Sequence, residues 1–299
     1  MNTYDLNNNE KLLLLFKESH QLQRKIAGRP SNNRLEHAIS IFTAQSLKAY
    51  TIWAICNPLP RNEILENNGI IHDFPSGYVL SRSMYETILV SRFPLLDEEF
   101  VNSRNAIVLV AILHGYREQN LLLTNMQSKN PKFEEIKAGL KQLKEDILKH
   151  PEYISLPQYA RDYTNRDDIP NQKWFPRKLP TIKLGAESEK ISVMEELALR
   201  AGFHASQHLN YYKYFSNYVH SEPFALNQIG AVRSPEQSKE LTNNLYSYAE
   251  NFLSVSLDIH LEVCKSEGIK VSISDDALEI IKLWKYINSE DMAKEISEH

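Results

Sequence analysis

The chain has 299 residues, of which 42% are hydrophobic and 24% charged, so it can bury the core of one large globular domain or two modest ones. Its 34 basic and 38 acidic side chains give a net charge of −4, which excludes broad, charge-driven binding to nucleic acid but allows a local basic pocket. The two cysteines, Cys56 and Cys264, lie far apart, and we expect two buried thiols in a reducing cytoplasm.

Helical patterns fill most of the chain, because glycine is scarce and long stretches lack proline. The polar segment 1–10 predicts no secretory signal, and the longest apolar run, 107–113, is far shorter than the ~20 residues that a membrane-spanning helix needs. Apolar periodicity and stop signals, Pro94 among them, predict helices in chain order: 10–26, 34–56, 76–93, 97–126, 130–149, 188–201, 203–220, 234–267 and 275–298. We therefore expect a single all-α domain over 1–299, a mostly antiparallel bundle of about eight or nine helices.

The range 150–187 breaks this pattern and is predicted to be a long proline-rich loop between two helical halves. A loop of this length is usually a lid, a binding loop or an insertion, with a linker as the second interpretation. Its cluster Lys173-Trp174-Phe175-Pro176-Arg177-Lys178 interleaves aromatic and basic side chains. Trp174 could stack on a nucleobase beside a bound phosphate, or it could only pin the loop to the bundle.

The predicted helix 203–220 holds three of the ten histidines and places most of its aromatic residues on one broad face. His204 and His208 lie one turn apart inside that face. Two such histidines can bind a metal if a third ligand joins them, but core histidines are the commoner outcome. We therefore expect no cofactor and keep the histidine pair as a weak metal alternative.

The predicted helix 76–93 is apolar on nearly all sides, which is typical of a helix at the centre of a bundle. Arg82 and Glu86 nevertheless stand four residues apart within it. Because a buried charge needs a partner, we expect these two side chains to pair.

Two short motifs resemble a known family. Ser81-Arg82-Ser83-Met84-Tyr85-Glu86 matches an S-R-x-x-[FY]-E helix, and the segment Tyr212 to His220 matches Y-x-x-x-S-x-[FY]-V-H. The pairing resembles a family of uncharacterised all-helical bacterial proteins, classed only as a domain of unknown function. That family is distantly similar to the higher-eukaryote-and-prokaryote nucleotide-binding (HEPN) helical domains.

Many HEPN domains are metal-independent ribonucleases of toxins and phage defence, with an Arg, four to six residues, then a His near the end of one helix. The nearest form in this chain is Lys213, six residues, His220, so the resemblance does not by itself carry the activity. Lys213 or Arg82 would have to replace the missing arginine.

The resulting candidate catalytic residues are His220, Arg82 and Glu86. Their predicted neighbours bind substrate: Lys213, Tyr212, Ser216 and Trp174. Tyr212, Ser216 and His220 share one helix face, and the C-terminal dipole favours a protonated His220 that could donate to a leaving oxygen while Arg82 binds a phosphate. The alternative is a structural network that ties two helices together.

Two functions stay open on this basis. The first is a cytoplasmic, metal-independent RNA nuclease or phosphodiesterase of the toxin or phage-defence type. The second is a non-catalytic helical module that binds a nucleotide, a small ligand or a partner protein. The expected partners are RNA or a nucleotide in a local pocket, with no membrane, and a homodimer is expected by analogy alone.

Overall fold

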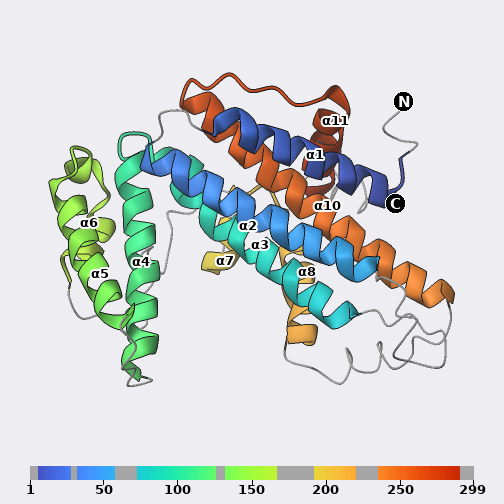
Figure 1. Cartoon of the computed structure of the whole chain (residues 1–299), viewed down its shortest axis with the longest axis horizontal. Helices are drawn as coiled ribbons and strands as arrows, with labels where there is room; N and C mark the ends of the chain where they lie inside the picture. Colours follow the sequence, from blue (N-terminus) through green and yellow to red (C-terminus); the bar gives the residue numbers. More distant parts are fainter. Residues whose placement is uncertain are drawn as a thin grey trace, which may run out of the picture. The chain divides into compact units, whose positions relative to one another are not determined.

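The computed structural model describes residues 6–27, 32–57, 73–125, 132–166, 192–219 and 235–289. Every regular element in these ranges is a helix, which confirms the all-α prediction (Figure 1). The elements are α1 (Asn8–Ile26), α2 (Asn33–Cys56), α3 (Phe74–Leu96), η2 (Glu98–Phe100), α4 (Arg104–Asn125), α5 (Lys132–Lys149), η3 (Tyr153–Ser155), α6 (Gln158–Asn165), α7 (Val193–Arg200), α8 (Ala205–Val219), α10 (Pro235–Ser266) and α11 (Asp275–Asn288). None of them is long and apolar enough to cross a lipid bilayer.

The helix ends follow local chemistry. Asn7 caps α1 through a reciprocal pair of hydrogen bonds with Glu10, of 3.0 and 2.9 Å. Gly268 ends α10 at φ +69°, a left-handed conformation that glycine adopts without strain, as its position in the sequence predicts. The hydroxyl of Ser274 accepts from the backbone of Ala277 and caps α11.

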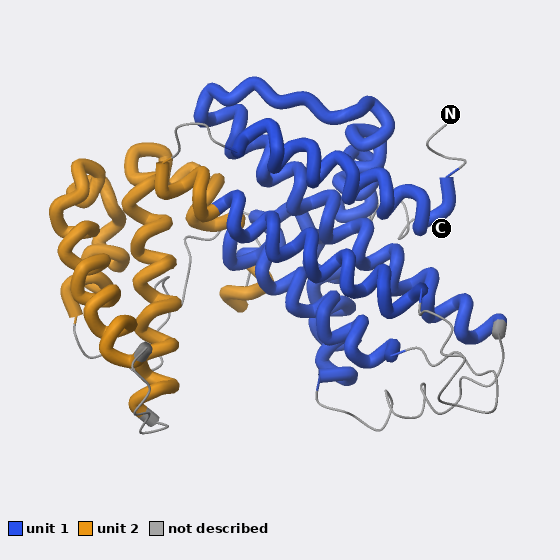
Figure 2. The backbone as a smooth tube through the Cα atoms, viewed as in Figure 1, with its two compact units in different colours: residues 1–29, 38–91, 197–299 blue, residues 30–37, 92–196 orange. Residues whose placement is uncertain are grey.

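The chain divides into two compact units (Figure 2). Unit 1 comprises 1–29, 38–91 and 197–299, and unit 2 comprises 30–37 and 92–196. In unit 1, α10 packs against α1 and α11, and its inner face is buried almost continuously from Leu245 to Cys264. Buried aromatic side chains of α3, α8, α10 and the connection between α7 and α8 meet in the same core: Tyr78, Tyr85, Phe203, Phe215 and Phe252.

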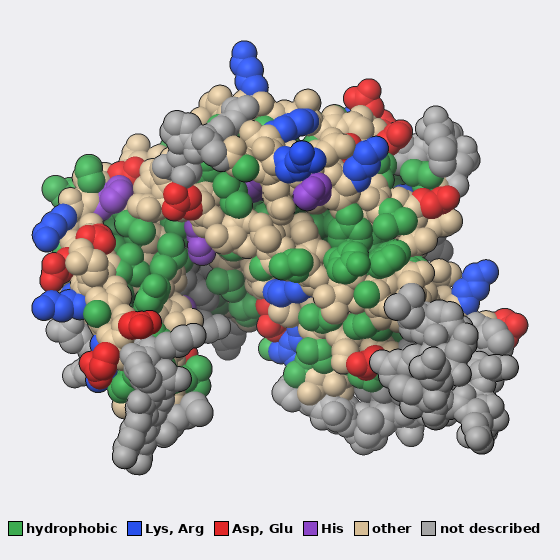
Figure 3. All heavy atoms as spheres, viewed as in Figure 1, with side chains coloured by type: hydrophobic (Ala, Val, Ile, Leu, Met, Phe, Trp, Pro, Cys, Tyr) green, Lys and Arg blue, Asp and Glu red, His purple; other side chains and the backbone are tan. Residues whose placement is uncertain are grey.

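Exposed apolar side chains on α1 and α2 include Leu13, Leu47 and Tyr50. Hydrophobic side chains gather over these helices on the visible face of unit 1 (Figure 3). Tyr50 contacts Phe16 edge-on at 6.0 Å between ring centroids, so an aromatic contact joins the two helices.

In unit 2, α4 packs against α5 and α6. Glu152 caps the start of α4, because its carboxylate accepts from the backbone N–H groups of Asn105 and Ala106 at 2.8 and 3.1 Å. The Arg34 guanidinium, buried in the same unit, donates twice to the Leu95 carbonyl near the end of α3, at 2.8 and 2.6 Å.

Several predicted boundaries were wrong. Pro94 does not end α3, which continues to Leu96: a proline in the last turn removes only one hydrogen bond, and Arg34 satisfies a terminal carbonyl there. The helix expected over 97–126 is split into η2 and α4, since Asp97 caps the first of these and Glu152 the second.

The range 150–187 contains α6, whose eight residues are too few for a periodic pattern to stand out and whose Ala160 and Tyr163 are buried. The helix expected over 188–201 is described only as α7, and the last helix only as far as Asn288. α4, which corresponds to part of the helix expected over 97–126, belongs to unit 2. The single-domain organisation stays a prediction.

Candidate functional site

One face of α3 carries four polar side chains, Arg82, Ser83, Glu86 and Thr87, which we call the α3 polar stripe. At about 100° per residue they span an arc of about 140°. Val79 and Val90 fall within the same arc and are 40% and 37% exposed, so this side of α3 faces solvent. The expectation of a helix buried on nearly all sides was therefore wrong for this arc. The opposite side carries Met84 and Ile88, which are 0% and 1% exposed.

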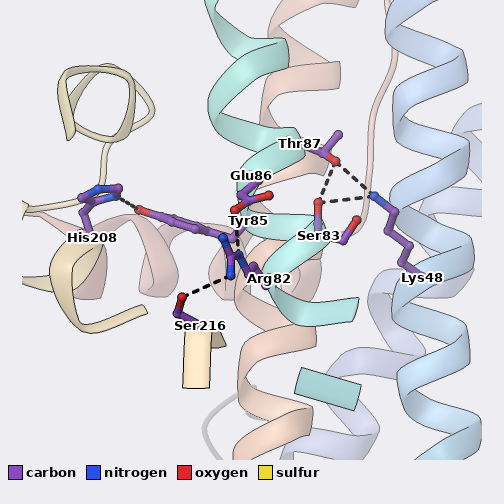
Figure 4. Close-up of polar contacts among 8 residues, drawn as sticks. All are labelled: Lys48, Arg82, Ser83, Tyr85, Glu86, Thr87, His208 and Ser216. Carbon is purple, nitrogen blue, oxygen red and sulfur yellow. Dashed lines mark hydrogen bonds and ion pairs between the residues drawn. The ribbon is translucent and has the colours of Figure 1, made fainter. Parts of the chain in front are cut away.

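The Arg82 guanidinium is held by three neighbours, of which Figure 4 shows Glu86 and Ser216. Its Nε donates to Glu86 Oε1 at 2.7 Å, and its Nη1 donates to Ser216 Oγ of α8 at 3.3 Å. Its Cζ lies 5.0 Å from the ring centroid of Tyr212, within the range of a cation–π contact. The structure thus brings together four of the residues predicted for the site.

This group lies at the edge of the protein core. The Arg82 side chain is 15% exposed, whereas that of Glu86 is 39% exposed and Tyr212 is 38% exposed. The Arg82 guanidinium has a fixed orientation and is still reached by solvent, so it can accept an oxyanion without the full desolvation cost of a wholly buried charge. The arrangement can therefore bind a phosphate or carboxylate group from solvent.

Lys48 of α2 completes the other side of the stripe. Its ammonium donates to Thr87 Oγ1 at 3.0 Å and to the Ser83 carbonyl at 3.3 Å. Burial lowers the pKa of Lys48, and the nearby Glu86 carboxylate opposes that shift. Lys48 was not among the predicted site residues, because nothing in the pattern of α2 distinguishes it from an ordinary surface lysine.

A second polar contact, between Tyr85 and His208, lies on the buried side of the site. The Tyr85 hydroxyl and His208 Nδ1 are 2.7 Å apart, and the two residues are 0% and 7% exposed. Burial, with a smaller contribution from Tyr211, raises the pKa of Tyr85 well above its usual value. The His208 ring lies 5.8 Å from that of Tyr212, so this pair adjoins the Arg82 group.

The two histidines of the weak metal alternative face different partners. His208 Nδ1 is directed at the Tyr85 hydroxyl, and His204 Nδ1 lies 2.8 Å from the hydroxyl of Ser206. In the described ranges, no three His, Cys, Asp or Glu side chains are grouped as metal ligands.

Lys213 is exposed on α8 and makes no hydrogen bond or ion pair with a described residue. His220 and Trp174 lie outside the described residues, so their predicted roles stay predictions.

Fold and site define an all-α protein with a solvent-facing arginine–carboxylate group between two helices. The chain belongs to the family of unknown function DUF5677, which matches residues 63–237. The match includes α3 and α8, with both motifs of the resemblance, but not Lys48. The expected membership of an uncharacterised family is thereby confirmed. No curated protein and no solved structure matches the chain.

Proposed function

We propose that this protein is a metal-independent RNA nuclease of the toxin or phage-defence type, in which Arg82 binds the scissile phosphate. One observation supports this function above others: the Arg82 guanidinium is oriented by Glu86 and Ser216 beside the half-exposed ring of Tyr212. A planar cation fixed in this way suits a phosphate, and an adjoining aromatic ring suits a base.

The proposed reaction is attack of a ribose 2′-oxygen on the adjacent phosphorus. The 2′-O–P bond forms while the P–O5′ bond breaks, which gives a 2′,3′-cyclic phosphate and a free 5′-hydroxyl. Glu86 takes the proton of the 2′-hydroxyl through Oε2, which accepts no hydrogen bond from a described residue, while Oε1 holds Arg82. His220, four residues after Ser216 in the sequence, donates a proton to the leaving O5′. Arg82 offsets the charge that develops on the phosphate oxygens.

The direct test is incubation of the full chain with a labelled single-stranded RNA in the presence of EDTA, followed by identification of the product ends. We expect cyclic phosphate ends, and we expect Arg82→Gln and His220→Ala each to lower the rate by at least about a hundredfold. Lys282→Met, an exposed change on α11, should leave the rate unaltered. Intact RNA with the natural protein, or variants that alter only the melting temperature, would rule the nuclease out.

The second candidate is a non-catalytic helical module that binds a nucleotide, a small ligand or a partner protein. The Arg82–Glu86 ion pair favours it, because the carboxylate 2.7 Å from the guanidinium neutralises the charge that would otherwise stabilise a transition state. Calorimetric titration with nucleotides separates the two functions. Saturable binding that depends on Arg82, with no product from any RNA, would establish the module.

The proposed setting is the cytoplasm, within a defence system. Both cysteines, on α2 and α10, are buried as free thiols, and free thiols suit a reducing compartment. Association into a homodimer remains part of the proposal, and sedimentation at several protein concentrations would test it.

A further inference from the structure

The α3 polar stripe has a cation at each edge: its own Arg82 at one, and Lys48 of α2 at the other. In Figure 4, α3 runs between Lys48 of α2 on one side and Ser216 of α8 on the other, and Arg82 reaches toward Ser216. Hydrogen bonds to Thr87 Oγ1 and to the Ser83 carbonyl direct the Lys48 ammonium to this face. An ordinary surface lysine has no such fixed direction. The stripe therefore has two separately positioned cationic ends.

The charges of this surface favour a ligand with more than one anionic group. Arg82 and Lys48 contribute two positive charges and Glu86 one negative charge, so the surface is cationic within a chain of net charge −4. Glu86 is bonded to Arg82 at 2.7 Å, and no hydrogen bond joins it to Lys48. Because two of the three ammonium donors are used by Thr87 and Ser83, the third is available to an incoming oxygen.

Tyr212 indicates which polyanion fits. Its ring is 38% exposed and lies against the Arg82 guanidinium at 5.0 Å. Aromatic rings beside cations bind unpaired bases by stacking while the cations contact the backbone, and a duplex would keep its bases out of reach of such a ring. The α3 polar stripe lies between the exposed Val79 and Val90, so an RNA strand has room to cross it.

We infer that the α3 polar stripe binds single-stranded RNA across its width, with one phosphate at Arg82, a neighbouring phosphate at Lys48 and a base on Tyr212. This inference rests on the proposed function, because it places the RNA by the phosphate at Arg82. It adds that the ligand is an oligonucleotide, not a mononucleotide, and that Lys48 is a substrate-binding residue.

The test compares two probes on the full chain: a 2′-O-methyl uridine hexanucleotide, which cannot form the cyclic phosphate, and uridine 5′-monophosphate. Affinities are measured by calorimetry or anisotropy between 50 and 200 mM salt, conditions over which a phosphate contact is visible. The variants are Lys48→Met, Arg82→Gln and the control Lys282→Met on α11. Circular dichroism and melting temperature establish that each variant is folded.

We expect Lys48→Met to weaken hexanucleotide binding about tenfold and to reduce the slope of log K against log salt by about 0.7, the loss of one phosphate contact. Binding of the monophosphate should be unchanged by Lys48→Met and lost in Arg82→Gln. If Lys48→Met lowers the affinity for both probes equally, or for neither, the second phosphate position at Lys48 is overturned. The phosphate position at Arg82 is not affected by that result. Binding of the hexanucleotide that depends on Lys48, without cleavage of ordinary RNA, would support this inference and overturn the nuclease alone.

Discussion

The hydroxyl of Tyr85 and Nδ1 of His208 form a 2.7 Å hydrogen bond that joins α3 to α8 inside the core of unit 1. Both residues are buried, and both rings sit among other aromatic side chains. The bond helps to fix α8 against α3 about two turns along α8 from Ser216, which contacts Arg82, so the register of the candidate site depends on it.

We expect Tyr85→Phe to lower the free energy of unfolding by about 1–3 kcal/mol, because it removes the hydroxyl that His208 Nδ1 faces in a buried site. Urea denaturation measures this change. Tyr50→Phe on α2, where the tyrosine is 55% exposed, is the matched control and should change stability by less than about 0.5 kcal/mol. Equal effects of the two variants would contradict a stabilising role for the buried hydrogen bond.

A buried carboxylate predicts that stability falls as pH rises toward neutrality. Glu250 of α10 is 1% exposed, its Oε1 accepts from Trp284 Nε1 of α11 at 2.8 Å, and its Oε2 has no partner among the described residues. Burial raises the pKa of Glu250 from 4.5 to about 7, against the opposing effects of the Trp284 hydrogen bond and Lys11. The folded state therefore prefers the protonated carboxyl.

The stability contributed by protonated Glu250 should be complete below pH 4.5 and lost as pH rises through about 7, a change on the order of 3 kcal/mol. Glu250→Gln keeps a neutral side chain and should remove this dependence. Urea midpoints of both proteins from pH 4 to pH 8 give the difference directly. Parallel curves for the two proteins would show that Glu250 ionises normally in the fold.

His260 of α10 predicts the opposite dependence. Its ring stacks on Phe42 at 4.8 Å, it is 1% exposed, and neither ring nitrogen has a hydrogen-bond partner among the described residues. Burial lowers the pKa of His260 from 6.5 to about 4. The neutral ring therefore contributes stability that is complete above pH 6.5 and lost as pH falls through about 4.

We expect His260→Phe to be at least as stable as the natural protein at pH 7 and more stable by on the order of 3 kcal/mol near pH 4, because no buried imidazole has to be charged. Between pH 4.5 and 6.5, Glu250 makes the free energy of unfolding fall with rising pH, whereas His260 makes it rise. The free energy of unfolding of the natural protein should therefore change less with pH than that of either variant. Thermal melting across this range, with the double variant as control, checks both slopes. A destabilised His260→Phe at pH 4 would mean that the larger ring does not fit.

In unit 2, Arg117 of α4 secures the end of α6. Its guanidinium donates to the carbonyls of Tyr163, Thr164 and Arg166 at 2.7, 3.4 and 2.5 Å, and it lies 4.5 Å above the Tyr163 ring. These are the carbonyls that a helix end leaves without backbone partners. We expect Arg117→Met to increase amide exchange in α6 by about tenfold or more, and Arg117→Lys to restore only part of the protection. Unchanged exchange in Arg117→Met would show that α6 is held by its apolar face alone.

Local patterns located most of the helices, because a helix is made by contacts three and four residues apart. The predicted bounds of α1, α2 and α10 agree with the structure to within about two residues. The same short range explains why the Arg82–Glu86 pair and the shared face of Tyr212 and Ser216 could be predicted from spacing. α6 was missed because eight residues give too little repetition.

Spacing along the chain was enough to predict an all-α protein, the ion pair on α3 and the shared face of Tyr212 and Ser216 on α8, since each depends on neighbours within one helix. Tertiary packing, in contrast, brings Lys48 to Thr87, 39 residues away, and His208 to Tyr85, 123 residues away. It also brings the Glu152 carboxylate to the start of α4. Such contacts depend on how whole helices pack, and packing is set by the summed fit of many buried side chains that no short pattern records.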